Sequence, residues 1–126
     1  MTEPHPTWPG KRRGKYNNRQ VQADGHPFDS QAEHRRYCEL KLLEQAGDIE
    51  DLRVHTRWEL QPAFQAPDGQ RVRAITYEDD FSYFDFDKDK FVVEDVKGHQ
   101  TAVFKIKAKM FRFSYPDFDF RIVKAK

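Results

Sequence analysis

Carboxylates are concentrated in one stretch of the chain, from Arg73 to Gly98, which reads RAITYEDDFSYFDFDKDKFVVEDVKG. Asp80, Asp95 and Lys97 are the residues there whose types and spacing could carry chemistry. Mg²⁺ prefers oxygen ligands and keeps several waters, so two or three carboxylates could hold it and leave positions for phosphate and water. A lysine two residues beyond Asp95, on the same face of a strand, could orient that water or neutralise a developing negative charge.

The acidic stretch is predicted to form a β-hairpin, because two β-rich arms flank a polar connection. The arms are residues 74–84 and 90–97. If the connection is symmetric, Asp80 lies opposite Asp95 and Glu78 lies opposite Lys97. Like charges directly opposite each other are unfavourable by up to about 1 kcal/mol, which favours a cation between Asp80 and Asp95.

Two hairpin residues also have purely structural interpretations. Lys97 could form a cross-strand ion pair with Glu78 instead of assisting a reaction. Glu94 points to the sheet face opposite Asp95 in a regular strand, so it is a second choice as a ligand.

A helix is predicted from Ser30 to about Ala46, with Gly47 ending it in the left-handed conformation typical of helix caps. Ser30 and Glu33 have the spacing of a capping box, in which the glutamate would only close the first turn. In the alternative interpretation, Glu33 points toward the acidic hairpin and helps to hold a metal. The sequence leaves both open.

The remaining elements predict an α+β fold with a mixed central sheet in a single domain. A half-buried strand over 52–60 precedes the acidic hairpin, a second helix covers about 101–113, and a last strand follows Pro116. A short hairpin is also expected between Arg19 and Phe28. On the second helix, the predicted packing stripe is Val103, Ile106, Met110 and Phe113, and the separate basic row is Lys105, Lys109 and Arg112.

Length and composition exclude several classes of protein. At 126 residues the chain fits one compact domain, with residues 1–15 expected to be a flexible basic arm that carries Lys11, Arg12 and Arg13. The single cysteine cannot form an intrachain disulfide, and the histidines lack zinc-site spacing. No apolar run reaches membrane length, so we expect a soluble, cytoplasmic protein with no membrane partner.

The order of these residues resembles the PD-(D/E)XK nuclease superfamily, and more closely its small phage-encoded nuclease-like proteins. The likeness rests on Glu33 at the start of the first helix, on Tyr77, Asp80 and Phe81 as a Tyr-x-x-Asp-Phe pattern, and on the segment from Glu94 to Gly98 with Thr101 after it. Asp79 stands where the superfamily name has proline, which leaves open whether Asp79 or Asp80 is the ligand, although the Tyr77 spacing favours Asp80.

The resemblance implies a restriction-endonuclease-like fold and a metal-dependent endodeoxyribonuclease, acting in phage DNA processing, recombination or repair in the host cytoplasm. The implied cofactor is Mg²⁺, with Mn²⁺ able to substitute, and the partner is DNA; a homodimer would suit a cut in both strands. The implied metal ligands are Asp80, Asp95 and Glu33, with Lys97 completing the catalytic set. The expected DNA contacts are Lys105, Lys109, Arg112, Arg36, Lys11, Arg12 and Arg13. The alternatives are a non-catalytic nucleic-acid-binding subunit on the same fold and an interaction module whose acids are merely solvated.

Overall fold

The computed structural model describes residues 21–23 and 25–125, which form an α+β domain with two helices and a mixed sheet. The predicted basic arm over residues 1–15, including Lys11, Arg12 and Arg13, lies outside the described residues. The predicted short hairpin is present as β1 (Val21–Ala23) and β2 (His26–Phe28), which pair antiparallel.

The central sheet has four strands in the order β10-β9-β8-β3. These strands are β3 (Ile49–Val54), β8 (Phe81–Asp85), β9 (Lys90–Lys97) and β10 (Phe118–Lys124). The last strand runs parallel to β9, whereas the other pairs are antiparallel, as a mixed sheet requires. Phe81 pairs with Glu94 in the β8–β9 hairpin, so Asp80 and Asp95 are the next positions beyond the last pair and the predicted register is confirmed there.

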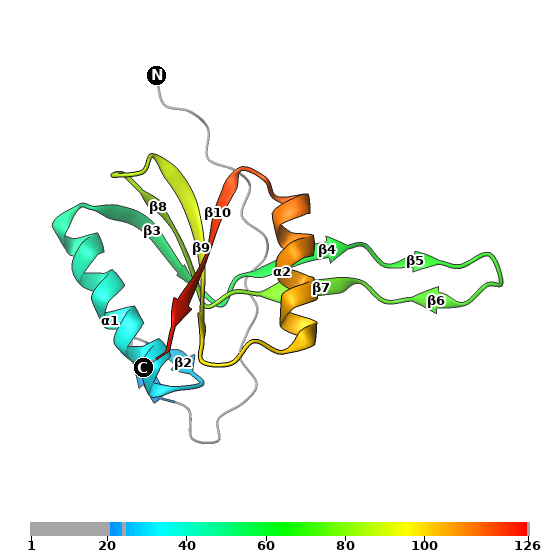
Figure 1. Ribbon diagram of the computed structural model, residues 1–126, viewed down its shortest axis with the longest axis horizontal. Helices are drawn as coiled ribbons and strands as arrows, with labels where there is room; N and C mark the ends of the chain where they lie inside the picture. Colours follow the sequence, from blue (N-terminus) through cyan, green and yellow to red (C-terminus); the bar gives the residue numbers. More distant parts are fainter. Residues whose placement is uncertain (1–20, 24, 126) are drawn as a thin grey trace.

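The helices lie on opposite sides of this sheet (Figure 1). Helix α1 (Gln31–Ala46) begins where the Ser30 side chain accepts the Glu33 N–H, and ends at Gly47 with φ 84°. Helix α2 (Ala102–Ser114) begins where the Thr101 side chain accepts the N–H of Phe104. Both helix starts and the first helix end agree with the prediction because cap residues are local signals.

Each helix covers a separate hydrophobic cluster, so alternate residues of β9 face different helices. Val92 belongs to the cluster under α1, and Val93 to the one under α2. By the same alternation Glu94 faces α1 and Asp95 faces α2.

The predicted packing stripe of α2 is wrong at three of its four residues. The buried residues are Phe104, Ala108 and Phe111, which pack in the same cluster as Trp58. Of the four side chains predicted to pack, Met110 does pack against this cluster, whereas Val103, Ile106 and Phe113 are exposed at 62%, 58% and 88%. Both sets recur at helical spacing, so periodicity alone could not choose between them, and the aromatic contacts with Trp58 decide which set is buried.

The predicted long strands on either side of the site are each divided in two. Strand β4 (Arg57–Gln61) is separated from β3 by two residues, and β7 (Ile75–Glu78) is separated from β8 by Asp79 and Asp80. Because β7 pairs with β4, Glu78 lies opposite Arg57, and the predicted pairing of Glu78 with Lys97 is wrong.

The β4–β7 ribbon leaves the central sheet and continues into a second ladder of β5 (Phe64–Gln65) and β6 (Arg71–Val72). Figure 1 shows this ribbon projecting away from the rest of the domain. The two strand breaks, at 55–56 and 79–80, lie beside each other: the His55 N–H donates to the Asp80 carbonyl at 3.2 Å, and the Asp79 N–H donates to the Thr56 carbonyl at 2.9 Å.

Candidate metal centre

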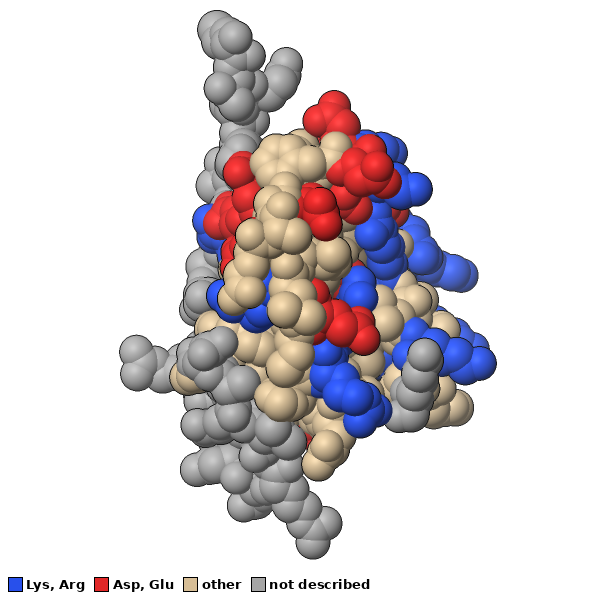
Figure 2. All heavy atoms as spheres, turned by 90° about the vertical axis from the view of Figure 1, so that its left-hand side faces the viewer, with Lys and Arg blue, Asp and Glu red and all other residues tan. Residues whose placement is uncertain are grey.

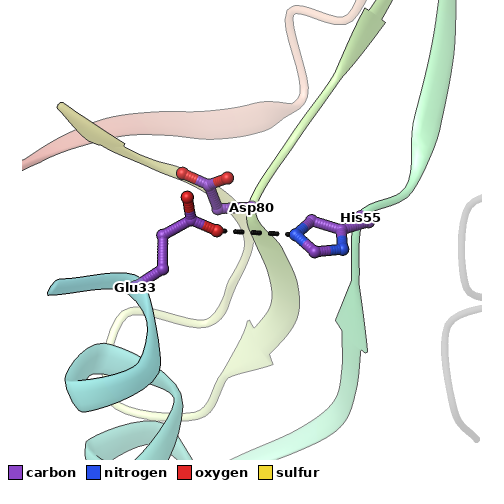
Figure 3. A group of neighbouring side chains, drawn as sticks. All are labelled: Glu33, His55 and Asp80. Atoms are coloured by element: carbon purple, nitrogen blue, oxygen red, sulfur yellow. Dashed lines mark hydrogen bonds and ion pairs between the residues drawn. The ribbon is translucent and has the colours of Figure 1, made fainter. Parts of the chain in front are cut away.

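Glu33, His55 and Asp80 converge at the place where the strands divide (Figure 3). They come from the first turn of α1, the break between β3 and β4, and the break between β7 and β8. One potential ligand atom from each of the three lies within 4.8 Å of the other two. Segments that are far apart in sequence therefore bring two carboxylates and an imidazole to one point.

The Glu33 carboxylate is turned into this group and is only 6% exposed. Its backbone N–H donates to Ser30 Oγ at 3.1 Å, so one half of the predicted capping box is present. The carboxylate approaches His55 Nε2 at 3.5 Å, the single partner it has among the described residues. The capping and metal-site interpretations of Glu33 are therefore compatible. Its backbone N–H takes part in the helix cap, while its carboxylate lies with His55 and Asp80.

Of the two neighbouring aspartates, Asp80 lies in the group with Glu33 and His55, and Asp79 does not. Asp80 Oδ2 accepts the Val96 N–H at 2.6 Å, which fixes the carboxylate beside β9. The pKa of Asp80 is raised well above its usual value by burial and by the negative charges of Asp95 and Glu33. A carboxylate held near two others is expected to attract a cation.

Asp79 is fully buried and serves as an anchor for the strand break. One of its oxygens accepts the Thr56 N–H at 2.8 Å and the other accepts the Trp58 indole N–H at 2.9 Å. Burial raises the pKa of Asp79 to about 7, although the Trp58 and Thr56 hydrogen bonds oppose that shift. Both oxygens are occupied by core donors, so the geometry favours Asp80 as the ligand.

Asp95 and Lys97 lie next to this group on the α2 side of β9. Asp95 Oδ2 accepts the Tyr77 O–H at 2.5 Å, and Asp95 Oδ1 is 3.6 Å from Lys97 Nζ. Burial raises the pKa of Asp95, while the contacts with Tyr77 and Lys97 lower it. Lys97 also lies over the Phe104 ring, 4.6 Å from its centroid. The predicted proximity of Lys97 to Asp95 is present, although Asp95 does not belong to the group of three found among the described residues.

Glu94, which is buried, forms an ion pair with the partly exposed Arg36 on the other face of the sheet. The Arg36 guanidinium donates to both oxygens of Glu94, at 2.8 and 2.7 Å, and Tyr83 donates its hydroxyl to the same carboxylate. Arg36 also donates to Glu39 at 2.9 Å. Arg36 as a DNA contact stays a prediction: its guanidinium neutralises Glu94, and the side chain is still 23% exposed.

His55 was not selected from the sequence, because alternation placed it on the exposed face of a continuous strand. In the structure it is half-buried, and its backbone φ is 56°. Burial alone would lower the pKa of His55, but the hydrogen bond to Glu33 and that carboxylate's charge contribute to a net rise. Its position at the break between two strands could be recognised only once the pairing of β4 with β7 was known.

Basic side chains are exposed on α2 as predicted. They are Lys105, Lys109 and Arg112, called the α2 basic row below. The Arg112 guanidinium carbon lies over the Phe120 ring, 5.1 Å from its centroid, so this cation packs against an aromatic ring of the protein. On the opposite side of the molecule, Figure 2 shows Asp and Glu side chains gathered toward the top and Lys and Arg along one edge. Charge is thus segregated over the surface.

The structure is that of an α+β protein with a group of side chains that could ligate a metal at the end of its central sheet. Residues 13–126 match the model of a family described as "Protein of unknown function (DUF1064)", and the chain belongs to that family. No curated protein and no solved structure matches the chain. Neither described helix is long and apolar enough to cross a membrane.

Proposed function

We propose that this chain is a metal-dependent endodeoxyribonuclease of the PD-(D/E)XK type, with a restriction-endonuclease-like core. The observation that carries the proposal is the convergence of Glu33 and Asp80 from separate elements, beside Asp95 and Lys97 on β9. An acid at a helix start, an aspartate before one strand and an Asp-x-Lys segment on the next are the parts that the resemblance requires.

The donor set fits a divalent cation. Glu33 and Asp80 offer carboxylate oxygens, and Asp95 is close enough for its charge to raise the pKa of Asp80. Hard oxygen donors in a partly open site suit Mg²⁺ or Mn²⁺. When bound, such an ion would act as a Lewis acid toward a scissile phosphate and lower the pKa of a coordinated water.

The protein's own residues would position the other reactants. Lys97 carries its ammonium group 3.6 Å from Asp95, where it can donate to a water or to a phosphate oxygen. Its packing over Phe104 restricts the stem and so directs the charge. Tyr77 donates a 2.5 Å hydrogen bond to Asp95, which would fix the Asp95 carboxylate relative to that of Asp80.

Two basic surfaces support a polyanionic substrate. The first is the α2 basic row, on the helix that follows Lys97 along the chain. The second is a pocket beside the start of α1, whose basic lining residues are Arg35, Arg36 and Lys124. Val96 also lines this pocket, and its N–H donates to Asp80, so the pocket borders the metal group. Lys and Arg at these places would neutralise phosphates of a duplex laid across the site.

The test is a cleavage panel of supercoiled plasmid, linear duplex and four-way junction DNA, each with Mg²⁺, Mn²⁺ or chelator. Wild type should cut at least one substrate with metal and none with chelator. Asp80→Asn should be inactive, whereas the matched control Asp87→Asn, an exposed aspartate in the β8–β9 turn, should remain active. Absence of cleavage in every condition would reject the nuclease. DNA binding without cleavage would favour the non-catalytic subunit instead.

A further inference from the structure

We propose that His55 supplies a nitrogen ligand to the metal held by Glu33 and Asp80, and that this ligand makes the site bind Mn²⁺ more tightly than Mg²⁺. The inference rests on the metal site of the proposed function and adds its selectivity. Imidazole suits first-row transition ions, whereas Mg²⁺ takes oxygen ligands almost exclusively. A single histidine in an otherwise carboxylate site therefore changes which ion binds best.

The spacing of the three side chains fits coordination of one ion. Ligand atoms about 2.1 Å from a metal lie about 3 Å apart when adjacent and about 4 Å apart when opposite. His55 Nε2 is 3.5 Å from Glu33 Oε1, and all three ligand atoms lie within 4.8 Å of one another. Figure 3 shows the three side chains gathered together, with the imidazole edge directed at the Glu33 carboxylate and the Asp80 carboxylate beside it. Small side-chain movements would bring the three atoms to coordination distance.

The burial of Glu33 also supports a cation at this point. It is more than nine-tenths buried, and its one partner among the described residues is His55 at 3.5 Å. Buried carboxylates are otherwise satisfied by several donors, because an ionised oxygen without a partner is strongly destabilising. Glu94, which is buried to a similar degree, receives three hydrogen bonds. A metal between Glu33, His55 and Asp80 would satisfy Glu33 in the same way.

The backbone holds His55 in place for this role. Its φ of 56° is in the left-handed region, where a residue other than glycine is strained by about 1–3 kcal/mol. The strained residue is tied directly to the ligand segment, because the His55 N–H donates to the Asp80 carbonyl at 3.2 Å. The hydrogen bond that stabilises the break therefore also fixes the imidazole relative to Asp80.

A simpler role for His55 would be an ion-pair partner for Glu33 with no contact to metal. Coupling of bound Mn²⁺ to an imidazole nitrogen separates the two roles, because only a ligating histidine produces it. The variant His55→Phe removes the ligand atom while keeping a ring beside Phe28, whose centroid is 5.9 Å from that of the imidazole. His34→Phe is the matched control: His34 lies next to Glu33 in sequence and 6.0 Å from the same Phe28 ring, but it is outside the metal group.

The experiment is calorimetric titration of the full chain with Mn²⁺ and with Mg²⁺, combined with pulsed EPR of bound Mn²⁺ to detect coupling to an imidazole nitrogen. Wild type and His34→Phe should show the nitrogen signal and prefer Mn²⁺. His55→Phe should lose the signal and on the order of 10- to 100-fold in Mn²⁺ affinity, the range found even for residues that only orient a ligand. Mg²⁺ affinity should fall less.

The outcomes distinguish this inference from the proposed function. Mn²⁺ bound to wild type without nitrogen coupling, or with coupling that survives in His55→Phe, would overturn the role of His55 and leave the metal site intact. Failure of wild type to bind either ion would overturn the metal site itself. If His55→Phe does not fold, His55→Gln provides a polar replacement without an imidazole. The wild-type spectrum remains decisive, because a signal that persists in His34→Phe cannot come from His34.

Discussion

Replacing Asp80 with asparagine should make the metal-free protein more stable while removing its response to metal. The wild-type carboxylate is held beside Asp95 and Glu33, which is unfavourable without a cation. Asparagine keeps an oxygen to accept the Val96 N–H, now a 2.6 Å bond to Asp80, and its amide can donate to the neighbouring carboxylates. The substitution therefore relieves repulsion without leaving a buried donor unsatisfied.

The size of the effect follows from the spacing of the charges. Two unit charges within 4.8 Å repel by at least about 3.5 kcal/mol at an effective dielectric constant of about 20. Partial protonation and the nearby His55 reduce this figure, so we expect a gain of about 1–2 kcal/mol, in the range of other stabilising substitutions. For 126 residues, an unfolding entropy of about 2.1 cal/mol/K per residue converts 1 kcal/mol into about 4 °C. The melting temperature should rise by about 4–8 °C.

The pH dependence has a definite sign. The pKa of Asp80 is raised in the folded protein, so the folded state holds its proton more tightly than the unfolded state does. The contribution of such a group to stability is fully present below its unfolded pKa and is lost as the pH rises through the folded pKa. Metal-free wild type should therefore lose stability relative to Asp80→Asn from about pH 4 upward. At lower pH the two should converge.

Thermal melts in chelator between pH 4 and pH 8 provide the measurement, with a second series in excess Mn²⁺. At 100 times the dissociation constant, metal should stabilise wild type by about 2.7 kcal/mol and leave Asp80→Asn unchanged. Asp79→Asn is the control: an amide cannot accept both the Thr56 and the Trp58 N–H, so stability should fall by about 1–3 kcal/mol. An Asp80→Asn protein that melts at or below wild type at pH 8 in chelator would refute the reasoning.

Three further results are expected. Lys97→Met should bind Mn²⁺ as wild type does but cleave about 10²–10³ times more slowly in single-turnover assays; an unchanged rate would contradict a catalytic role. Arg36→Met should lower the free energy of unfolding by about 3–5 kcal/mol in denaturant titrations by leaving Glu94 buried without its partner, and adding Glu94→Gln should recover part of the loss. Unchanged stability of the single variant would exclude that ion pair as a structural element. Replacing the α2 basic row with alanines should reduce the salt dependence of DNA binding by about three phosphate contacts, and an unaltered slope would exclude this surface.

Local signals made much of the fold predictable. Ser30 and Gly47 mark the ends of α1 because an N-cap side chain and a left-handed glycine satisfy backbone groups without help from the rest of the molecule. The polar turn between β8 and β9 fixes which residues pair, since a hairpin's register follows from its connection. Asp80 and Asp95 could therefore be placed next to each other from the sequence.

Features that depend on long-range contacts could not be predicted in the same way. The choice between two apolar stripes on α2 depends on where Trp58 lies, and nothing near the helix in sequence encodes that. The basic character of Arg36 predicted a DNA contact. Local patterns could not show that its guanidinium pairs with Glu94, which is 58 residues away. The sequence shows how many charged residues there are, but only the fold shows whether each one faces solvent or a buried partner.

The division of the strands is what creates the candidate site. In a continuous hairpin, Asp79 and Asp80 would simply alternate between the two faces of one sheet. Because the chain breaks there, Asp79 enters the core and accepts two N–H groups, while Asp80 is left at the rim beside β9. The opposite break places His55 against Asp80 through a backbone hydrogen bond. Asp79 thus holds the two breaks together, and disrupting that anchor should disorganise the site even though Asp79 itself is not one of the proposed ligands.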